Sequence, residues 1–165
     1  MKKILSAAVL CLTLFISIGA AKSMPQTFCL HPIGKVVKTA NQTSLEIFPA
    51  YRDGLLGLAG FSHLVVLYWF DRNDTPAKRA TLRVHPRGDK RNPLTGVFAT
   101  RSPRRPNLIG LSVCKIRSVE AGRILVDKID AFNQTPIIDI KPYIPANDEV
   151  SESSVPGWVR GEFEK

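Results

Sequence analysis

The chain has 165 residues, of which 44% are apolar, and a formal net charge of +9 at pH 7. This length predicts one domain, and this apolar fraction excludes a largely disordered chain. The positive charge is concentrated between Lys78 and Arg105, where nine Lys and Arg residues accompany the single acid Asp89. Such a segment attracts nucleic acid or other anions, although a solvated basic surface without a ligand has the same pattern.

The first 23 residues have the features of a secretory signal peptide. Lys2 and Lys3 precede an apolar run over residues 4–18, and Ala21-Lys22-Ser23 is typical of a cleavage site. The run is shorter than the roughly 20 residues that span a membrane, so we expect no stable membrane insertion after cleavage. The mature protein would then be periplasmic or secreted. If translation starts instead at Met24, the protein would be cytoplasmic.

Short β-rich runs separated by Gly and Pro follow this leader, which is typical of strands joined by turns. The runs with strand character are residues 33–38, 45–48, 63–71, 80–85, 96–100, 109–119, 123–130 and 137–141. The fold class is therefore mainly β. Seven to eight short strands indicate one small β-barrel or a sandwich.

Details within these runs lead to further expectations. Residues 63–70 are apolar almost throughout, which predicts a central strand with both faces buried. In residues 109–119 the apolar side shifts from odd to even positions, which predicts a bulge near Val113. Three glycines limit residues 51–60 to a single helical turn. The polar, acidic composition after Pro145 predicts a loose tail over residues 146–165.

The segment GVFATRSPRRPNLIGLS, residues 96–112, is the strongest candidate for a ligand site. Pro103 and Pro106 restrict the backbone, so the loop between two apolar runs is stiff and loses little entropy on binding. The loop presents Arg101, Arg104, Arg105 and Asn107, whose guanidinium and amide groups suit carboxylates or phosphates. The alternative is an ordinary β-turn with exposed arginines.

Residues 137–143, IIDIKPY, place Asp139 and Lys141 on one side of a strand. These two side chains either pair with each other or contact a ligand. The turn over residues 133–136, Asn-Gln-Thr-Pro, offers several hydrogen-bonding groups beside them.

Other site types lack support in the sequence. Neither a GxGxxG motif nor a P-loop is present, and the three histidines share no ligand spacing, so we expect no metal site. Cys29 and Cys114 would remain after cleavage, either as one disulfide or with Cys114 as a small core residue.

Three blocks in order resemble the TsaA-like family, whose characterised members are tRNA N6-threonylcarbamoyladenosine methyltransferases. They are GLAGFSHLVVLYWF (57–70), GVFATRSPRRPNLIGLS (96–112) and TPIIDIKPYIP (135–145), within a predicted domain of residues 24–145. The resemblance implies a small β-barrel that binds S-adenosylmethionine without a Rossmann sheet, forms a homodimer and acts on tRNA.

The resemblance also implies where the ligands bind. Cofactor contacts are expected at Phe70, Asp71, Arg101, Leu111, Asn133, Gln134, Thr135 and Pro136, and substrate contacts at Arg104, Arg105, Asn107 and Lys141. The sequence departs from the family pattern at four places: residues 38–44 lack a Pro-Arg-Gln stretch, Asp71 replaces a common histidine, Asn133-Gln134 replaces Asp-Gly, and Leu108 replaces a proline.

Two functions follow as hypotheses. The first is a methyltransferase that works mainly by positioning its reactants, since no covalent catalytic residue is evident. The second is an exported, non-catalytic module of the same fold that binds an anion or a partner protein.

Overall fold

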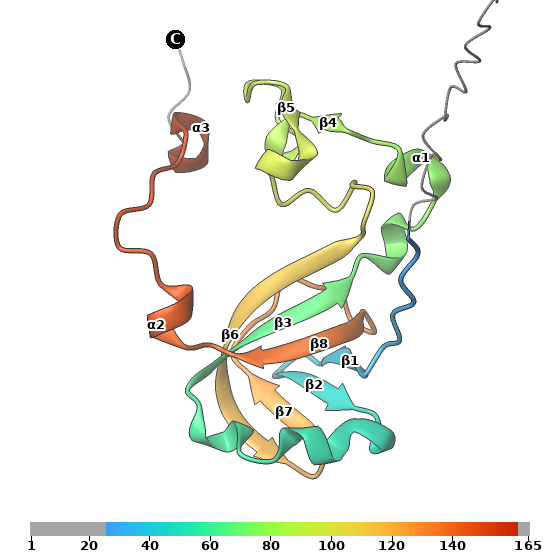
Figure 1. Ribbon diagram of the computed structural model, residues 1–165, viewed down its shortest axis with the longest axis vertical. Coiled ribbons are helices and arrows are strands. Elements are labelled where there is room, and N and C mark those ends of the chain that lie inside the picture. Colours follow the sequence, from blue (N-terminus) through green and yellow to red (C-terminus); the bar gives the residue numbers. More distant parts are fainter. Residues whose placement is uncertain (1–25, 162–165) are drawn as a thin grey trace, which may run out of the picture.

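The computed structural model describes residues 26–161, so the predicted signal peptide lies outside the described part of the chain. Six antiparallel strands close into a barrel in the order β1-β2-β7-β6-β3-β8 (Figure 1). They are β1 Gly34–Lys38, β2 Thr43–Ile47, β3 His63–Trp69, β6 Ile109–Glu120, β7 Arg123–Val126 and β8 Pro136–Pro142. The expected small β-barrel is confirmed, with fewer strands in its wall than the seven or eight predicted.

The two remaining strands, β4 Arg83–Val84 and β5 Thr95–Gly96, form a separate sheet above the barrel in Figure 1. Both are shorter than the predicted runs. Ala80 is the C-cap of the helix α1 Pro76–Arg79. Thr75 is the N-cap of this helix, and its side chain accepts a hydrogen bond from the Lys78 amide. The run predicted for residues 96–100 is mostly the 3₁₀ helix η5 Val97–Ala99.

The core lies inside the barrel, where alternate residues of each strand point inward. Fully buried side chains include Val36 on β1, Leu45 on β2, Leu64 on β3, Ile124 on β7 and Ile137 on β8. Because the barrel is closed, its strands leave no unpaired sheet edge.

Strand β3 is central, as predicted, because it pairs with both β6 and β8. The expectation that both of its faces are buried is wrong. Leu64, Val66 and Tyr68 are buried, whereas the residues between them are half-buried. In an antiparallel barrel only the inner face of a strand packs into the core.

The bulge predicted near Val113 is also wrong. The pairing of β3 with β6 is unbroken from His63–Lys115 to Trp69–Ile109, and the register shift lies further on, between Ile116 and Ser118 opposite β7. Ile109, Leu111 and Val113 face outward and are about 40% exposed or more. The shift in apolar pattern therefore marks an exposed apolar stripe on the outside of β6.

Short helices and a C-terminal segment complete the fold. The 3₁₀ helices η1 Pro49–Leu55 and η2 Leu58–Gly60 run along the lower end of the barrel, where a single helical turn was predicted (Figure 1). At the other end are η3 Asp71–Asn73 and η4 Pro86–Gly88. The segment predicted as a loose tail contains α2 Pro145–Asp148 and α3 Gly157–Arg160 in its described part.

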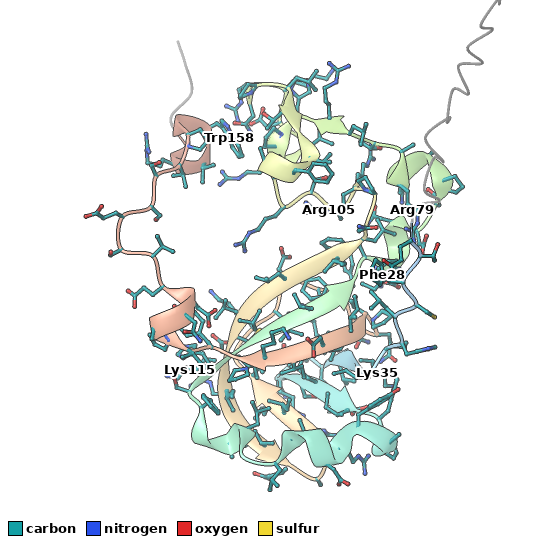
Figure 2. All side chains as sticks on the ribbon, viewed as in Figure 1. Phe28, Lys35, Arg79, Arg105, Lys115 and Trp158 are labelled. Atoms are coloured by element: carbon teal, nitrogen blue, oxygen red, sulfur yellow. The ribbon has the colours of Figure 1, made fainter. Side chains whose placement is uncertain are left out.

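The segment with α3 returns to the sheet above the barrel, where Arg87 Nη2 donates a hydrogen bond to the Val159 carbonyl at 3.3 Å. Figure 2 shows Trp158 beside this sheet. Within residues 26–161 no helix has the length and apolar character needed to cross a membrane.

Candidate functional site

A cavity of about 1070 Å³ lies at the upper end of the barrel, where β3 ends and β6 begins. Its wall is formed by residues 68–73 at the end of β3, by residues 109–113 of β6, by the loop after β7 and by Lys38. The loop of residues 101–107, called the arginine loop below, contributes Arg101, Pro103 and Arg105. This is the end of the barrel from which the chain passes from β3 to η3, and at which it returns from the small sheet of β4 and β5 into β6 (Figure 1). The site is therefore built where a rigid barrel rim supports several loops.

The structure brings six of the predicted site residues to this one cavity. They are Phe70, Asp71, Arg101, Arg105, Leu111 and Thr135. They come from four separate segments of the chain, so their convergence is a property of the fold and not of sequence proximity. Their roles as ligand contacts stay predictions.

The other predicted residues lie outside the cavity wall. Asn133 Oδ1 accepts a hydrogen bond from the Lys38 amide at 2.9 Å, and Gln134 Oε1 accepts one from Lys35 Nζ at 3.1 Å. Lys141 pairs with Asp139 at 2.8 Å, which is the structural alternative considered for these two side chains. Pro136, Arg104 and Asn107 also fall outside the wall.

Gly110 determines the floor of the cavity. It lies opposite Tyr68 in the β3–β6 pairing, and a Cβ atom on Gly110 would collide with the Tyr68 ring. The ring therefore lies flat over the backbone of β6, and it packs edge-on against Phe70 with centroids 5.5 Å apart. Only glycine permits this close approach.

Tyr68 also holds the loop after β7 in place. Its hydroxyl donates a hydrogen bond to the Asp130 carbonyl at 2.5 Å and lies 3.3 Å from Ser112 Oγ, which in turn accepts from the Asp130 amide at 3.4 Å. Burial raises the pKa of Tyr68 above its ordinary value of 10.0. At neutral pH Tyr68 is thus an uncharged donor that joins β3, β6 and this loop.

The arginine loop is held by its own short polar side chains. Thr100 Oγ1 accepts from the Ser102 amide at 3.2 Å, and Ser102 Oγ accepts from the Arg104 amide at 3.2 Å. Arg105 donates to the carbonyls of Thr100 and Val97 at 3.5 and 3.4 Å, so part of its bonding capacity closes the loop. Arg101 is exposed and its guanidinium makes no hydrogen bond or ion pair with the described residues, which leaves it available for a ligand.

Arg79 anchors this loop to the end of β3, a role that the sequence analysis did not identify. Its guanidinium donates to Asp74 at 2.7 Å and to the Pro106 carbonyl at 3.0 Å, and it stacks 5.2 Å from the Trp69 ring. Hydrogen bonds from Arg79 and from the Trp69 indole hold the pKa of Asp74 below its usual value. Figure 2 shows Arg79 and Arg105 above the barrel on this side.

Positive charge predominates around the cavity. Its wall contains the cations Lys38, Arg72, Arg101, Arg105 and Lys128 and the two carboxylates Asp71 and Asp130. A concave wall of one charge sign raises the local concentration of ligands of the opposite sign. The prediction of an anion-attracting site is consistent with this wall.

Metal and disulfide chemistry find no support in the described part of the chain. No group of three or more His, Cys, Asp or Glu residues in that part is arranged to hold a metal ion. Cys29 is exposed and Cys114 is buried inside the barrel, and both are free thiols, so Cys114 is the core residue considered as the alternative to a disulfide. Burial raises the pKa of the Cys114 thiol to about 11, which keeps it protonated and unreactive.

Comparison with known proteins shows the family of this chain. The family model described as tRNA-methyltransferase O N-terminal domain matches residues 23–149. The chain belongs to this family. A probable S-adenosyl-L-methionine-binding protein of Methanocaldococcus jannaschii is 54% identical over 114 residues, which are 69% of this chain and 90% of that relative.

The chain is also similar to relatives whose names state an activity, and to proteins of solved structure. The human tRNA (adenine(37)-N6)-methyltransferase is 44% identical over 105 residues, 62% of this chain and 23% of that protein. Two crystal structures of TrmO, one of them from Pseudomonas aeruginosa, match with TM-scores of 0.62 and 0.60 at 33% and 30% identity, over 79% and 78% of this chain. The chain spans only 64% and 62% of those two structures.

A substitution at Tyr68 tests the account of the cavity floor. Tyr68→Phe keeps the ring and removes the hydroxyl bound to the Asp130 carbonyl. We expect the free energy of unfolding in urea at pH 7 to fall by about 1 kcal/mol. Burial raises the pKa of Tyr68, so its ionisation opposes folding. The contribution of Tyr68 to the free energy of unfolding is therefore complete below pH 10.0, and it is lost as the pH rises through the pKa of Tyr68 in the folded protein. The Tyr68→Phe variant should lack the part of the loss of stability at alkaline pH that comes from ionisation of Tyr68.

Tyr51→Phe is the matched control, since Tyr51 is 43% exposed on η1 and its hydroxyl has no hydrogen bond within residues 26–161. Its stability should equal that of the unmodified protein. Equal effects of the two substitutions would contradict the role assigned to Tyr68.

Proposed function

We propose that this protein is an S-adenosylmethionine-dependent methyltransferase that acts on N6 of adenine 37 in tRNA, with N6-threonylcarbamoyladenosine as the target nucleoside. Family membership and relatives named for S-adenosylmethionine binding and for adenine-37 N6 methylation support the proposal. The observation that carries it is the convergence of Phe70, Asp71, Arg101, Leu111 and Thr135 on one cavity.

The residues around the cavity fit S-adenosylmethionine. The volume of about 1070 Å³ lies at the upper limit of ordinary small-molecule sites, which are roughly 300–1000 Å³. The unpaired guanidinium of Arg101 suits the methionine carboxylate. Asp71 offers a carboxylate for the ammonium group or the ribose hydroxyls, and Phe70 and Leu111 offer apolar contacts for the adenine ring.

Chemistry in this site needs little from the protein beyond placement. S-adenosylmethionine, when bound, supplies a methyl group that its sulfonium already activates. The side chains of this chain then have to orient the acceptor amine, exclude water and maintain the cavity shape. Tyr68 and Arg79 contribute to that shape, because they fasten two of the loops that form the wall.

Two departures from the family pattern have visible structural consequences. The β1–β2 connection is a tight turn closed by the Thr39 amide and the Gln42 carbonyl, and Lys38 is the residue of this hairpin that lines the cavity. Gln134, where the family has glycine, takes a positive φ of 69°.

The exposed stripe on β6 supports a homodimer. Ile109, Leu111 and Val113 are 39%, 41% and 47% exposed and border the cavity. A second copy packed on this stripe would cover it and complete the cavity wall. Val113→Glu should then sediment with the mass of one chain, whereas the unmodified protein and the control Leu56→Glu, at the 95% exposed Leu56 on the far end of the barrel, sediment with twice that mass. A monomeric unmodified protein would contradict the proposal.

Export of the protein is a separate proposal. It favours a non-catalytic binding module over the methyltransferase. The predicted signal peptide of residues 1–23 lies at the N-terminal side of the family match and shares only residue 23 with it. An exported chain would lack access to cytoplasmic tRNA and would act as a non-catalytic module that binds an anion or a partner through the same cavity. Fractionation of native cells separates these functions. Mature protein in the periplasm would support the exported module, and retention of all protein in the cytoplasm would support the methyltransferase with a start at Met24.

Arg101 provides the test of cofactor binding. Isothermal titration of the purified protein with S-adenosylmethionine should give a binding isotherm, and Arg101→Ala should weaken the affinity by at least about tenfold, because a hydrogen-bonded charge is lost. Arg117→Ala removes an exposed charge on β6 outside the cavity wall, and this variant should bind as the unmodified protein does. Absence of heat at millimolar cofactor would overturn the proposed function, and equal binding by the Arg101 variant would remove Arg101 from the site.

A further inference from the structure

Arg72 and Phe132 form a pair at the cavity wall whose role the proposed cofactor does not explain. The guanidinium carbon of Arg72 lies 4.1 Å from the centroid of the Phe132 ring. Arg72 comes from η3 and Phe132 from the loop after β7, so two separate wall segments meet here. A guanidinium stacked on a phenyl ring is a favourable arrangement that holds the ring in one orientation.

Packing does not account for Phe132. Its side chain is 60% exposed, whereas its neighbours Ile129 and Ala131 pack with the barrel core. Within residues 26–161 the ring has Arg72 as its stacking partner. A large aromatic side chain held rigidly at a cavity, with much of its surface exposed, has the properties of a stacking platform.

The charge of the wall identifies the class of ligand. S-adenosylmethionine has one carboxylate, one ammonium and one sulfonium group, so it is a net cation. The wall has five cations and two carboxylates, which is more positive charge than a single carboxylate requires. A polyanion balances the excess, and RNA is a polyanion that also supplies flat rings for stacking.

The size of the cavity agrees with two occupants. About 1070 Å³ lies at the upper limit of ordinary small-molecule sites, and a methyl transfer needs donor and acceptor in the same space. Enzymes that modify a nucleobase take the base out of its stack and hold it against aromatic side chains in the pocket.

We propose that the target adenine, turned out of the RNA loop, stacks on the ring of Phe132, and that Arg72 holds this ring and faces the neighbouring phosphate. The inference rests on the proposed function and adds to it the residues that receive the acceptor. Phe132 and Arg72 are thus contacts of the RNA base and not of the cofactor.

The experiment uses Phe132→Leu and two RNA probes. One probe, the adenine probe, is a synthetic anticodon stem–loop with N6-threonylcarbamoyladenosine at position 37, and the other has an abasic site at the same position. Affinity for each RNA is measured by fluorescence anisotropy at one fixed salt concentration, because such affinities depend on salt. Binding of S-adenosylmethionine is measured separately by calorimetry. Phe61→Leu is the matched control, since Phe61 is 39% exposed and precedes β3 at the opposite end of this strand.

Phe132→Leu should bind the adenine probe about tenfold more weakly, as expected for the loss of one stacked base. It should bind the abasic probe as the unmodified protein does, and its affinity for S-adenosylmethionine should stay within twofold. Arg72→Gln should weaken binding of both probes, because the phosphate that Arg72 faces is present in each, and the loss should be larger for the adenine probe, because the ring of Phe132 is also released. The Phe61 control should leave every affinity unchanged, and thermal melting should show that all the variants are folded.

Three results would overturn the proposal. Equal weakening of both RNA probes would show that Phe132 does not contact the base at position 37. Loss of cofactor affinity alone would assign the pair to S-adenosylmethionine. Unmodified protein that binds the cofactor but neither RNA would refute base stacking and leave cofactor binding intact. If the protein binds the adenine probe as expected but does not bind the cofactor, the proposed methyltransferase function is refuted. The comparison of the two RNA probes still decides the role of Phe132 in that case.

Discussion

The packing of the Tyr68 ring on Gly110 is the contact on which the site depends. Without a side chain at residue 110, β3 and β6 can lie together while a full aromatic ring is placed between the barrel core and the cavity. The hydroxyl of that ring then reaches the Asp130 carbonyl and fixes the loop after β7. The cavity floor and one of its walls therefore follow from a single pair of facing residues.

The arginines near the cavity divide into those that build the site and those that remain available to ligands. Arg79 bonds to Asp74 and to the Pro106 carbonyl, and Arg105 bonds to the carbonyls of its own loop. Arg101 has no such partner among the described residues, and Arg72 stacks on Phe132. Arginines that look alike in the sequence thus differ in the structure: some are bonded to the backbone or to a carboxylate, and Arg101 is open to a ligand.

The class of fold, and the loop that borders the candidate cavity, could be predicted because they depend on local patterns. Alternating apolar residues and frequent turns indicated a small barrel, and the arginine loop between two strands indicated a ligand site. The bulge near Val113 was predicted wrongly because an apolar residue on an outer face looks like a core residue when only the sequence is read. Ile109, Leu111 and Val113 face outward.

Contacts between distant segments were beyond the reach of sequence patterns. No spacing relates Arg72 to Phe132, or Tyr68 to the Asp130 carbonyl, because these pairs form only when β3, η3 and the loop after β7 come together. Phe132 offered one weak signal, an aromatic residue directly before the polar turn of residues 133–136. The proposed function requires that a methyl group be transferred to adenine 37 in this cavity.

The most direct measurement is transfer of a radiolabelled methyl group from S-adenosylmethionine to tRNA that carries N6-threonylcarbamoyladenosine at position 37, beside the same tRNA with unmodified adenine. Label incorporated at adenine 37 of the modified tRNA, and lost with Arg101→Ala, is the predicted result. No incorporation into either tRNA by folded protein that binds the cofactor would contradict the account.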